Sequence, residues 1–349
     1  MKKTFFAALL LALIALLASC SPAAQPTNTP IPEIPTQVQV AATVALEPTP
    51  TPQPQPGKVI LSADAALLPE AEALLNELSA PAGLTVETRP AGQPLQPGEI
   101  TADVKLVVML NAPGNAAELA AAAPQTQFVV TSAVDVTPAA NLTVIRQRAE
   151  NQVFVAGFLS TLFSPDFRGA GLLPSDGPLA ALLQEAYVNG GRYYCGVCAP
   201  GWPLGMKYPQ AAALPTASDG PTWQASAAAL FDNQKADVYF LAPEAARPEV
   251  VGYLQDRTQF DRAVLVIGTQ PPVDGLQAQW AASVRFDDLA VLRQVWADAA
   301  AGKGGTVVEA PLLVDYVNEE LVGPGRLRLV DELLDEIAAG RISPFTVAP

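Results

Sequence analysis

Short apolar runs alternate with longer amphipathic stretches from residue 58 almost to the C-terminus. The runs are rich in Val, Leu and Ile, as in VKLVVML at 104–110. The stretches between them repeat apolar residues three and four positions apart, which is the spacing of one helix face. Because strands buried on both faces appear as continuous apolar runs, this alternation predicts parallel sheets with helices on both sides. The fold class is therefore predicted to be α/β.

The same pattern gives the approximate position of each element. Strands are expected at 59–61, 84–86, 104–110, 128–130, 142–145, 169–173, 211–214, 238–241, 263–267, 282–284 and 306–317. Helices are expected at 68–78, 116–123, 179–188, 223–231, 249–254, 289–301 and 330–339, besides a central helix that ends before Pro165. About 290 residues of this alternation are enough for two lobes, with a ligand site in the cleft between them.

The segment 148–177, RAENQVFVAGFLSTLFSPDFRGAGLLPSDG, connects the two halves of this pattern. Apolar residues recur at helical spacing around Gly157, which permits the close approach of another element. The motif Ser-Asp-Gly at 175–177 follows a predicted strand and is expected to cap the next helix. We therefore expect the chain to pass from one lobe to the other in this segment.

The N-terminus resembles a bacterial lipoprotein signal. Lys2 and Lys3 precede an apolar run at 5–18, which is short for a membrane span, and Leu-Ala-Ser leads directly into Cys20. This pattern predicts a signal peptide at 1–20, with Cys20 lipidated and the protein anchored on the extracytoplasmic face of the cell membrane. An ordinary secretory signal or a membrane anchor, with Cys20 present by chance, is the alternative.

Residues 21–57 are dense in Pro and Thr, as in TNTPIPEIPTQ and EPTPTPQPQPG. Such spacing of proline opposes helix and sheet and favours extended polyproline-like conformers. We expect a disordered linker that acts as a semi-rigid spacer between the membrane and the folded part. A proline-rich recognition motif for a partner protein is the alternative.

The chain is strongly acidic, with 20 Lys and Arg against 34 Asp and Glu and a net charge of −14. Removal of a signal peptide that contains Lys2 and Lys3 would make the remaining chain more acidic still. So acidic a protein does not attract nucleic acid or anionic lipid through its net field. We therefore expect no nucleic-acid partner, and contact with the membrane through the lipid.

The residues that usually carry catalysis are scarce. The chain contains no histidine, which removes the commonest general base and metal ligand and any Ser-His-Asp triad. No phosphate-binding glycine motif follows a predicted strand. Cys195 and Cys198 form a CxxC pair, but the APGWP that follows cannot extend a helix and no second CxxC completes a zinc site. We expect no enzyme, cofactor or metal; the cysteine pair is interpreted as a local disulfide, with free thiols or a redox or metal role as alternatives.

Candidate ligand-binding residues follow predicted strands. Asp135 and Asp176 come after strand ends, where a carboxylate could accept hydrogen bonds from ligand hydroxyls, although a capping or turn role explains each as well. Trp202 lies in a loop and is suited to stacking on a ring, or to burial. Asp287 and Asp288 precede a predicted helix and are expected to cap it.

The segment 127–192 is similar to the basic membrane protein family of solute-binding lipoproteins. The similarity lies in VVTSAVD, RAENQVFVAGFLSTLFS and GAGLLPSDGPLAALLQEAYVNGGR, and later in ADVYFLAP, AVLVIGTQ, WAASVRFDDLAVLRQVWADAAAGK and EIAAGRISPF. It implies a type I periplasmic-binding-protein fold, in which two Rossmann-like lobes are joined by three crossovers, serving an ABC importer of nucleosides or other solutes. By this pattern the first lobe comprises 58–147 and 274–306, and the second 148–273 and 307–349. Asp135, Arg148 and Asp176 are the positions that match the family's ligand site.

Three segments depart from the family's ligand-binding motifs. SADAAL stands at 62–67 instead of Asp-x-Ser-Phe-Asn, APEAA at 242–246 instead of a Gly-rich turn, and GTQPP at 268–272 instead of Gly-Val-Asp-Ser-Asp-Gln. The scaffold is thus kept while the nucleoside contacts are replaced. Two hypotheses follow: a monomeric solute-binding lipoprotein that delivers a small solute to an ABC permease, or a sensor or envelope adaptor that keeps the binding fold with a degenerate site. A redox enzyme that uses the cysteine pair is a third, weaker alternative.

Overall fold

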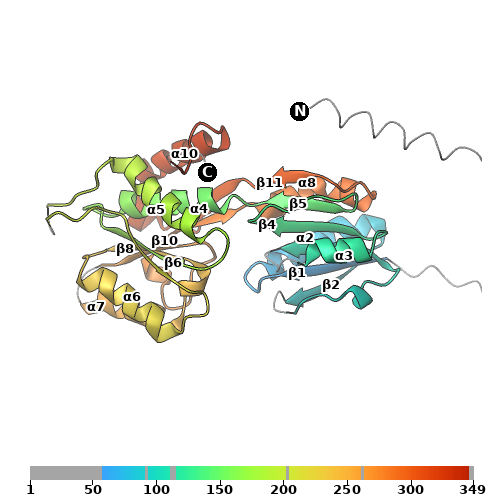
Figure 1. The fold of residues 1–349 in the computed structure, drawn as a ribbon, viewed down its shortest axis with the longest axis horizontal. Helices are drawn as coiled ribbons and strands as arrows, with labels where there is room; N and C mark the ends of the chain where they lie inside the picture. Colours follow the sequence, from blue (N-terminus) through green and yellow to red (C-terminus); the bar gives the residue numbers. More distant parts are fainter. Residues whose placement is uncertain (1–56, 91–92, 111–114, 202–203, 261–262, 346–349) are drawn as a thin grey trace, which may run out of the picture. The chain divides into compact units, whose positions relative to one another are not determined.

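The computed structural model describes residues 57–90, 93–110, 115–201, 204–260 and 263–345 (Figure 1). The predicted signal peptide with Cys20, nearly all of the linker 21–57, and Trp202 lie outside these residues. Within the described ranges, no helix is both long enough and apolar enough to cross a membrane.

The first lobe is built on a six-stranded sheet of order β11-β5-β4-β3-β1-β2, in which every pairing is parallel. Its strands are β1 (Lys58–Ala63), β2 (Thr85–Pro90), β3 (Val104–Leu110), β4 (Gln127–Ser132), β5 (Leu142–Arg146) and β11 (Val307–Glu309). Helices α2 (Leu68–Ser79) and α8 (Asp288–Ala300) pack on one face and α3 (Ala116–Ala122) on the other. Alternate residues of the strands enter the two cores, as expected for a sheet covered on both sides.

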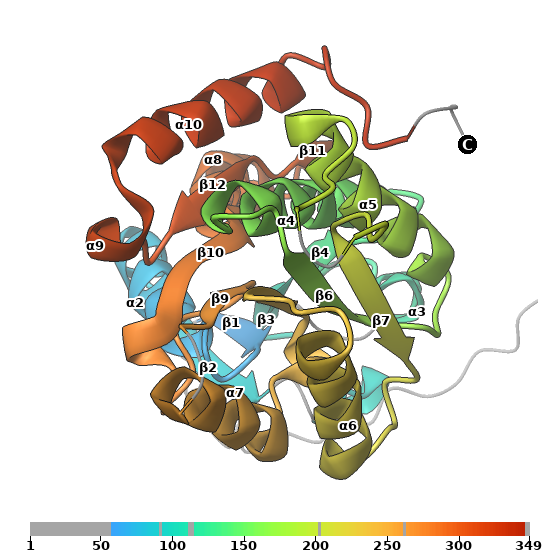
Figure 2. The same cartoon turned by 90° about the vertical axis from the view of Figure 1, so that its left-hand side faces the viewer.

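The second lobe contains another six-stranded sheet, of order β12-β10-β9-β8-β6-β7. Its strands are β6 (Gly169–Pro174), β7 (Gln210–Leu214), β8 (Val238–Leu241), β9 (Leu265–Gly268), β10 (Trp280–Phe286) and β12 (Leu312–Asp315), and only the β10–β12 pair is antiparallel. Helices α4 (Ala149–Phe163), α5 (Ala180–Cys195) and α10 (Pro324–Ala338) cover one face, and α6 (Gly220–Asp232) and α7 (Pro248–Phe260) cover the other (Figure 2). A short helix, α9 (Glu319–Val322), precedes α10.

Four short 3-10 turns complete the described elements, at Ala80–Ala82, Pro97–Glu99, Pro243–Ala245 and Gln277–Gln279. The strands and helices agree closely with the alternation in the sequence, and the α/β prediction is confirmed. The clearest extension is α5, which continues to Cys195, seven residues beyond the predicted end at 188.

The chain crosses between the two lobes three times. The crossings lie between β5 and α4, between β10 and α8, and between β11 and β12. The sheets differ from the predicted lobe boundaries at two places, because β10 belongs to the second sheet and β11 to the first. The predicted single strand at 306–317 is two strands in different sheets, divided at Pro311, whose ring removes the backbone donor a continuous strand needs.

Helix α4 is buried on every side, from Val153 to Phe163. It lies against α5 (Figure 2), and glycines at the crossing let the two backbones approach. A Cβ on Gly157 would lie 1.9 Å from the carbonyl oxygen of Tyr187, and a Cβ on Gly190 would lie 1.9 Å from that of Phe154. No real Cβ atom tolerates such distances, so the crossing requires glycine on both helices.

Candidate functional site

A cavity of about 460 Å³ is lined by residues of both lobes. Its lining comes from segments that directly follow β1, β4, β5, β8 and β9, and from the end of β10. Ligand sites of open α/β sheets form at the carboxyl ends of strands. This cavity lies at the carboxyl ends of strands from both sheets, one in each lobe. Its charged and amide-bearing side chains include Asp64, Gln147, Gln152, Glu244, Arg285 and Asp288.

Side chains tie the crossover segments together beside the cavity. Gln147, in the first crossover, donates from Nε2 to Oδ2 of Asp288 at 2.8 Å, just beyond the second crossover. Arg148 donates from Nε to Oε1 of Glu309 at 3.0 Å, which joins the first crossover to the third. These contacts place polar, breakable interactions where the lobes would rotate relative to each other.

Asp288 is the most deeply buried carboxyl group of the cavity lining, with 5% of the residue exposed. It is the first residue of α8, and its Oδ1 has no hydrogen-bond partner among the described residues. The pKa of this carboxyl is raised to about 7. Burial is the largest cause, because the charged form loses hydration, and the charge of the neighbouring Asp287 acts in the same direction; the hydrogen bond from Gln147 and the charge of Arg285 lower the pKa. The side chain is therefore close to half ionised at neutral pH.

Only one member of the Asp287-Asp288 pair caps α8. Asp287 accepts a hydrogen bond from the backbone N–H of Ala290 at 3.1 Å, as predicted. Asp288 occupies the next position and lines the cavity instead. The sequence rule that selected Asp135 and Asp176, a carboxylate directly after a strand, applies equally to Asp288 and could have identified it.

Glu244 lines the cavity from the second lobe. It lies in the 3-10 turn Pro243–Ala245 that follows β8, in the segment where a Gly-rich turn was expected from the family resemblance. Its Oε2 is buried without a hydrogen-bond partner among the described residues. The departure from the family pattern therefore introduces a carboxylate into the cavity.

The predicted ligand-binding residues are placed elsewhere. The side chain of Asp135 is 99% exposed and pairs with Arg146 at 2.9 Å. Asp176 accepts hydrogen bonds from the backbone N–H and the hydroxyl of Thr216, at 2.8 and 3.0 Å, and these bonds lower its pKa. Neither residue lines the cavity, and Arg148 joins two crossovers as described above.

The predicted helix cap at Ser-Asp-Gly 175–177 is wrong. Helix α5 begins at Ala180, and the residue before it makes no side-chain capping bond. The carboxylate of Asp176 reaches the loop after β7 instead, where it fixes Thr216. A contact between residues 40 positions apart depends on the pairing of β6 with β7, which local sequence does not specify.

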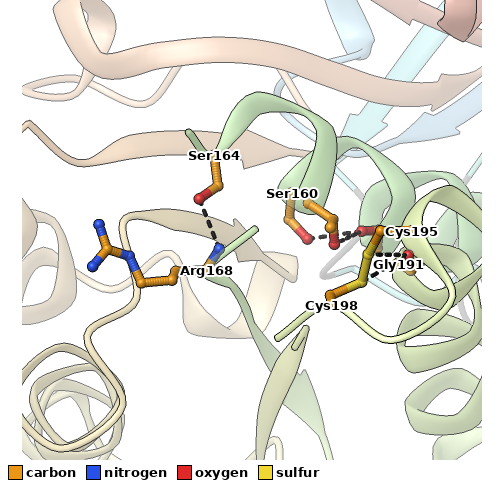
Figure 3. The surroundings of a disulfide bond; sticks show 8 residues. Ser160, Ser164, Arg168, Gly191, Cys195 and Cys198 are labelled. Atoms are coloured by element: carbon orange, nitrogen blue, oxygen red, sulfur yellow. Dashed lines mark hydrogen bonds between the residues drawn. A yellow bond between two sulfur atoms is a disulfide. The ribbon is translucent and has the colours of Figure 1, made fainter. Parts of the chain in front are cut away.

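Cys195 and Cys198 form a disulfide at the C-terminal end of α5, with their Cα atoms 5.4 Å apart (Figure 3). Both sulfur atoms lie close to the carbonyl oxygen of Gly191, at 3.4 and 3.3 Å. The negative end of the helix dipole opposes formation of a thiolate, the reverse of the arrangement in reactive CxxC motifs. The pair does not line the cavity, so its position favours a structural role.

Replacing Cys195 and Cys198 together by serine is expected to lower stability modestly and to leave solute binding unchanged. Opening so small a loop removes about 2 kcal/mol or less by the chain-entropy argument. Urea unfolding of the double variant and of the reduced native protein would measure this loss. A specific loss of ligand binding in a folded double variant would contradict the structural role.

No protein-family model matches the chain, and no curated protein sequence matches it. Among solved structures, it is similar to an ABC transporter solute-binding protein from Aeropyrum pernix K1, with 14% identity over 84% of this chain and 94% of that chain and a TM-score of 0.61. A solute-binding protein of an ABC transporter system from Conexibacter woesei matches with 16% identity over 82% of this chain and 98% of that chain, with a TM-score of 0.60. A LacI transcriptional regulator from a Rhodococcus species matches with 11% identity over 74% of this chain and 96% of that chain, with a TM-score of 0.54.

These similarities show the fold, which is that of type I periplasmic binding proteins. The same two-lobed architecture occurs in a solute-binding protein and in a transcriptional regulator, so the fold alone does not assign the function. Membership of the basic membrane protein family stays a hypothesis based on the sequence motifs.

Proposed function

We propose that this chain is an extracytoplasmic solute-binding protein that captures a small polar solute between its lobes and delivers it to the permease of an ABC importer. The observation that carries the proposal is the cavity at the strand ends of both lobes, beside three crossovers that can act as a hinge. A volume of about 460 Å³ falls within the usual range of small-molecule sites. Binding in this position couples the solute to the distance between the lobes.

The three segments that depart from the family motifs support a binding role with a changed cargo. Each of them contributes to the cavity: Asp64 from the first, Glu244 from the second, and Thr269 and Gln270 from the third. The loops therefore keep their place at the cavity while their side chains differ. A nucleoside-like cargo, implied by the resemblance, loses its expected contacts, so we propose a solute of different chemistry.

The N-terminal pattern completes the proposal. A lipid on Cys20 would hold the protein at the extracytoplasmic face of the membrane. Residues 21–57 would span up to roughly 115 Å as an extended polyproline II chain, which allows the lobes to reach a permease in the same membrane. We propose that the protein acts as a monomer and that the cavity binds its solute without chemical conversion.

A thermal-shift screen tests the binding function. Residues 54–349 form one compact unit, which can be produced without the signal and most of the linker. A solute present at about 100 times its dissociation constant contributes about 2.7 kcal/mol, and we expect it to raise the melting temperature by about 5 °C. The library should contain sugars, nucleosides, amino acids and amines. If no compound changes the melting temperature, the sensor or adaptor hypothesis replaces this proposal.

A further inference from the structure

The cavity lining carries more negative than positive groups. Asp64, Glu244 and Asp288 contribute three carboxyl groups, and Arg285 is the cation among the described lining residues. The guanidinium of Arg285 is already paired, because it donates to Oδ2 of Asp315 at 2.7 Å and lies over the ring of Tyr316 at 5.3 Å. The positive charge of Arg285 is thus paired with the carboxylate of Asp315. The cavity lining therefore contains more hydrogen-bond-accepting carboxyl groups than cationic groups.

Two of these acceptors are buried and unsatisfied. Oδ1 of Asp288 and Oε2 of Glu244 have no hydrogen-bond partner among the described residues, and Asp288 is only 5% exposed. A buried polar atom without a partner destabilises the folded protein, and does so more strongly when it is charged. Native proteins rarely keep such atoms unless a ligand or an ordered water satisfies them. Both atoms belong to cavity-lining residues, which indicates that a ligand with hydrogen-bond donors completes the site.

The two residues come from different lobes. Asp288 begins α8 in the first lobe, and Glu244 follows β8 in the second. A ligand that donates to both would join the lobes, which is the differential contact that a closing hinge requires.

We propose that the cavity binds a small organic cation that carries a protonated amine, held by the carboxylates of Asp288 and Glu244 on opposite lobes. This inference rests on the proposed function and names its solute class. An ammonium group supplies several donors and a positive charge together, whereas a hydroxyl supplies one donor and no charge. Thr269 and Gln270 line the same cavity and offer hydrogen bonds to further polar groups of the solute.

A bare metal ion fits this cavity less well than an organic cation. The described residues contain no group of three or more His, Cys, Asp or Glu side chains placed to hold a metal. A volume of about 460 Å³ also exceeds what a single coordinated ion fills.

The state of Asp288 makes the binding depend on pH. Its pKa of about 7 in the unliganded protein means that an ammonium group must bind the ionised fraction. The charge of Asp287 raises this pKa and the charge of Arg285 lowers it, and Asp64 and Glu244 are the other carboxyl groups of the cavity lining. Affinity for an amine should therefore be constant above about pH 7 and fall by up to about tenfold for each pH unit below it.

Calorimetric titration of residues 54–349 with matched four-carbon probes tests the inference. Putrescine carries two ammonium groups, 1,4-butanediol replaces them by hydroxyls, and succinate replaces them by carboxylates; spermidine and agmatine extend the cationic series. At pH 8 we expect at least one of the three amines to bind, and 1,4-butanediol and succinate to bind at least tenfold more weakly than that amine. The same titrations at pH 5.5 should show a loss of affinity for the amine.

Two variants connect the result to the cavity. Asp288→Asn should weaken amine binding by tenfold or more and remove its pH dependence, and Glu244→Gln should weaken it as well. Asp298→Asn is the matched control, because Asp298 lies near the other end of α8, its side chain is 73% exposed, and it does not line the cavity. Equal affinity for the best-bound amine and 1,4-butanediol, or an Asp288→Asn protein that keeps full affinity for that amine, would overturn the inference.

The outcome also separates this inference from the proposed function. A neutral sugar or nucleoside that binds while the amines do not would overturn the amine assignment and leave solute capture intact. If neither the amines nor any compound of the wider library binds, both proposals are overturned together.

Discussion

Replacing Gly190 by alanine is expected to destabilise the protein by about 3 kcal/mol or more. The new methyl group would lie 1.9 Å from the carbonyl oxygen of Phe154 and 2.9 Å from the backbone nitrogen of Phe158. These are backbone atoms of α4, a helix buried on all sides beneath the second sheet, so they cannot move aside as a flexible side chain would. Helices α4 and α5 would have to separate, and the core between them would lose its packing.

Urea unfolding measures this loss, and Gly252→Ala provides the matched comparison. Gly252 also lies inside a helix, α7, but a Cβ there would meet no atom within 4 Å. Alanine should stabilise that position by up to about 1 kcal/mol, because it restricts the unfolded chain and favours helix. Similar effects of the two substitutions would contradict the account of the α4–α5 crossing.

Asp288→Asn is expected to stabilise the unliganded protein at pH 8 and to have little effect at pH 4. The folded-state pKa of about 7 lies above the ordinary value of 3.8, so the folded protein retains a proton that the unfolded chain releases between these pH values. The contribution of Asp288 to stability therefore becomes less favourable as pH rises from about 4 to 7, by up to roughly 4 kcal/mol if the full shift applies. Asparagine cannot ionise, and its amide oxygen can still accept the hydrogen bond from Gln147.

The difference in unfolding free energy between the variant and the native protein, followed from pH 4 to 8, tests this expectation. Contributions of all other carboxylates cancel in the difference, because both proteins contain them. A difference that does not change with pH would show that Asp288 ionises freely in the folded protein. The same substitution is expected to weaken amine binding, so stability and binding should change in opposite directions, as is common for residues kept for function.

The alternation of apolar runs and amphipathic stretches was sufficient to predict the elements, because each strand and helix is specified locally by its own periodicity. The lobe boundaries could not be predicted from this local pattern. Strand β10 belongs to the second sheet, and Pro311 separates β11 from β12, although 306–317 reads as one apolar stretch. Which sheet a strand joins depends on its partners, which lie far away in the sequence.

For individual side chains at the cavity, local sequence is equally insufficient to predict their contacts. A carboxylate after a strand lies at the correct edge of a sheet, yet Asp135 and Asp176 at such positions pair with Arg146 and Thr216. Asp288 was assigned to helix capping because two adjacent aspartates precede the predicted helix at 289–301, and only the structure shows which of them takes the cap. The position of the cavity at the strand ends could thus be predicted from the sequence, while the residues that line it required the arrangement of the strands.

The three crossovers also determine when the first lobe can fold. Its helix α8 and edge strand β11 come from residues 288–309, which follow five of the six strands of the second sheet in the chain. A chain emerging in N- to C-terminal order therefore exposes the apolar face of β3, β4 and β5 that α8 covers until about residue 300 has appeared. Contacts over so long a sequence separation form slowly. If the protein is exported unfolded, as the proposed function requires, this delay would keep the first lobe incomplete, and so competent for translocation, until about residue 300 has been made.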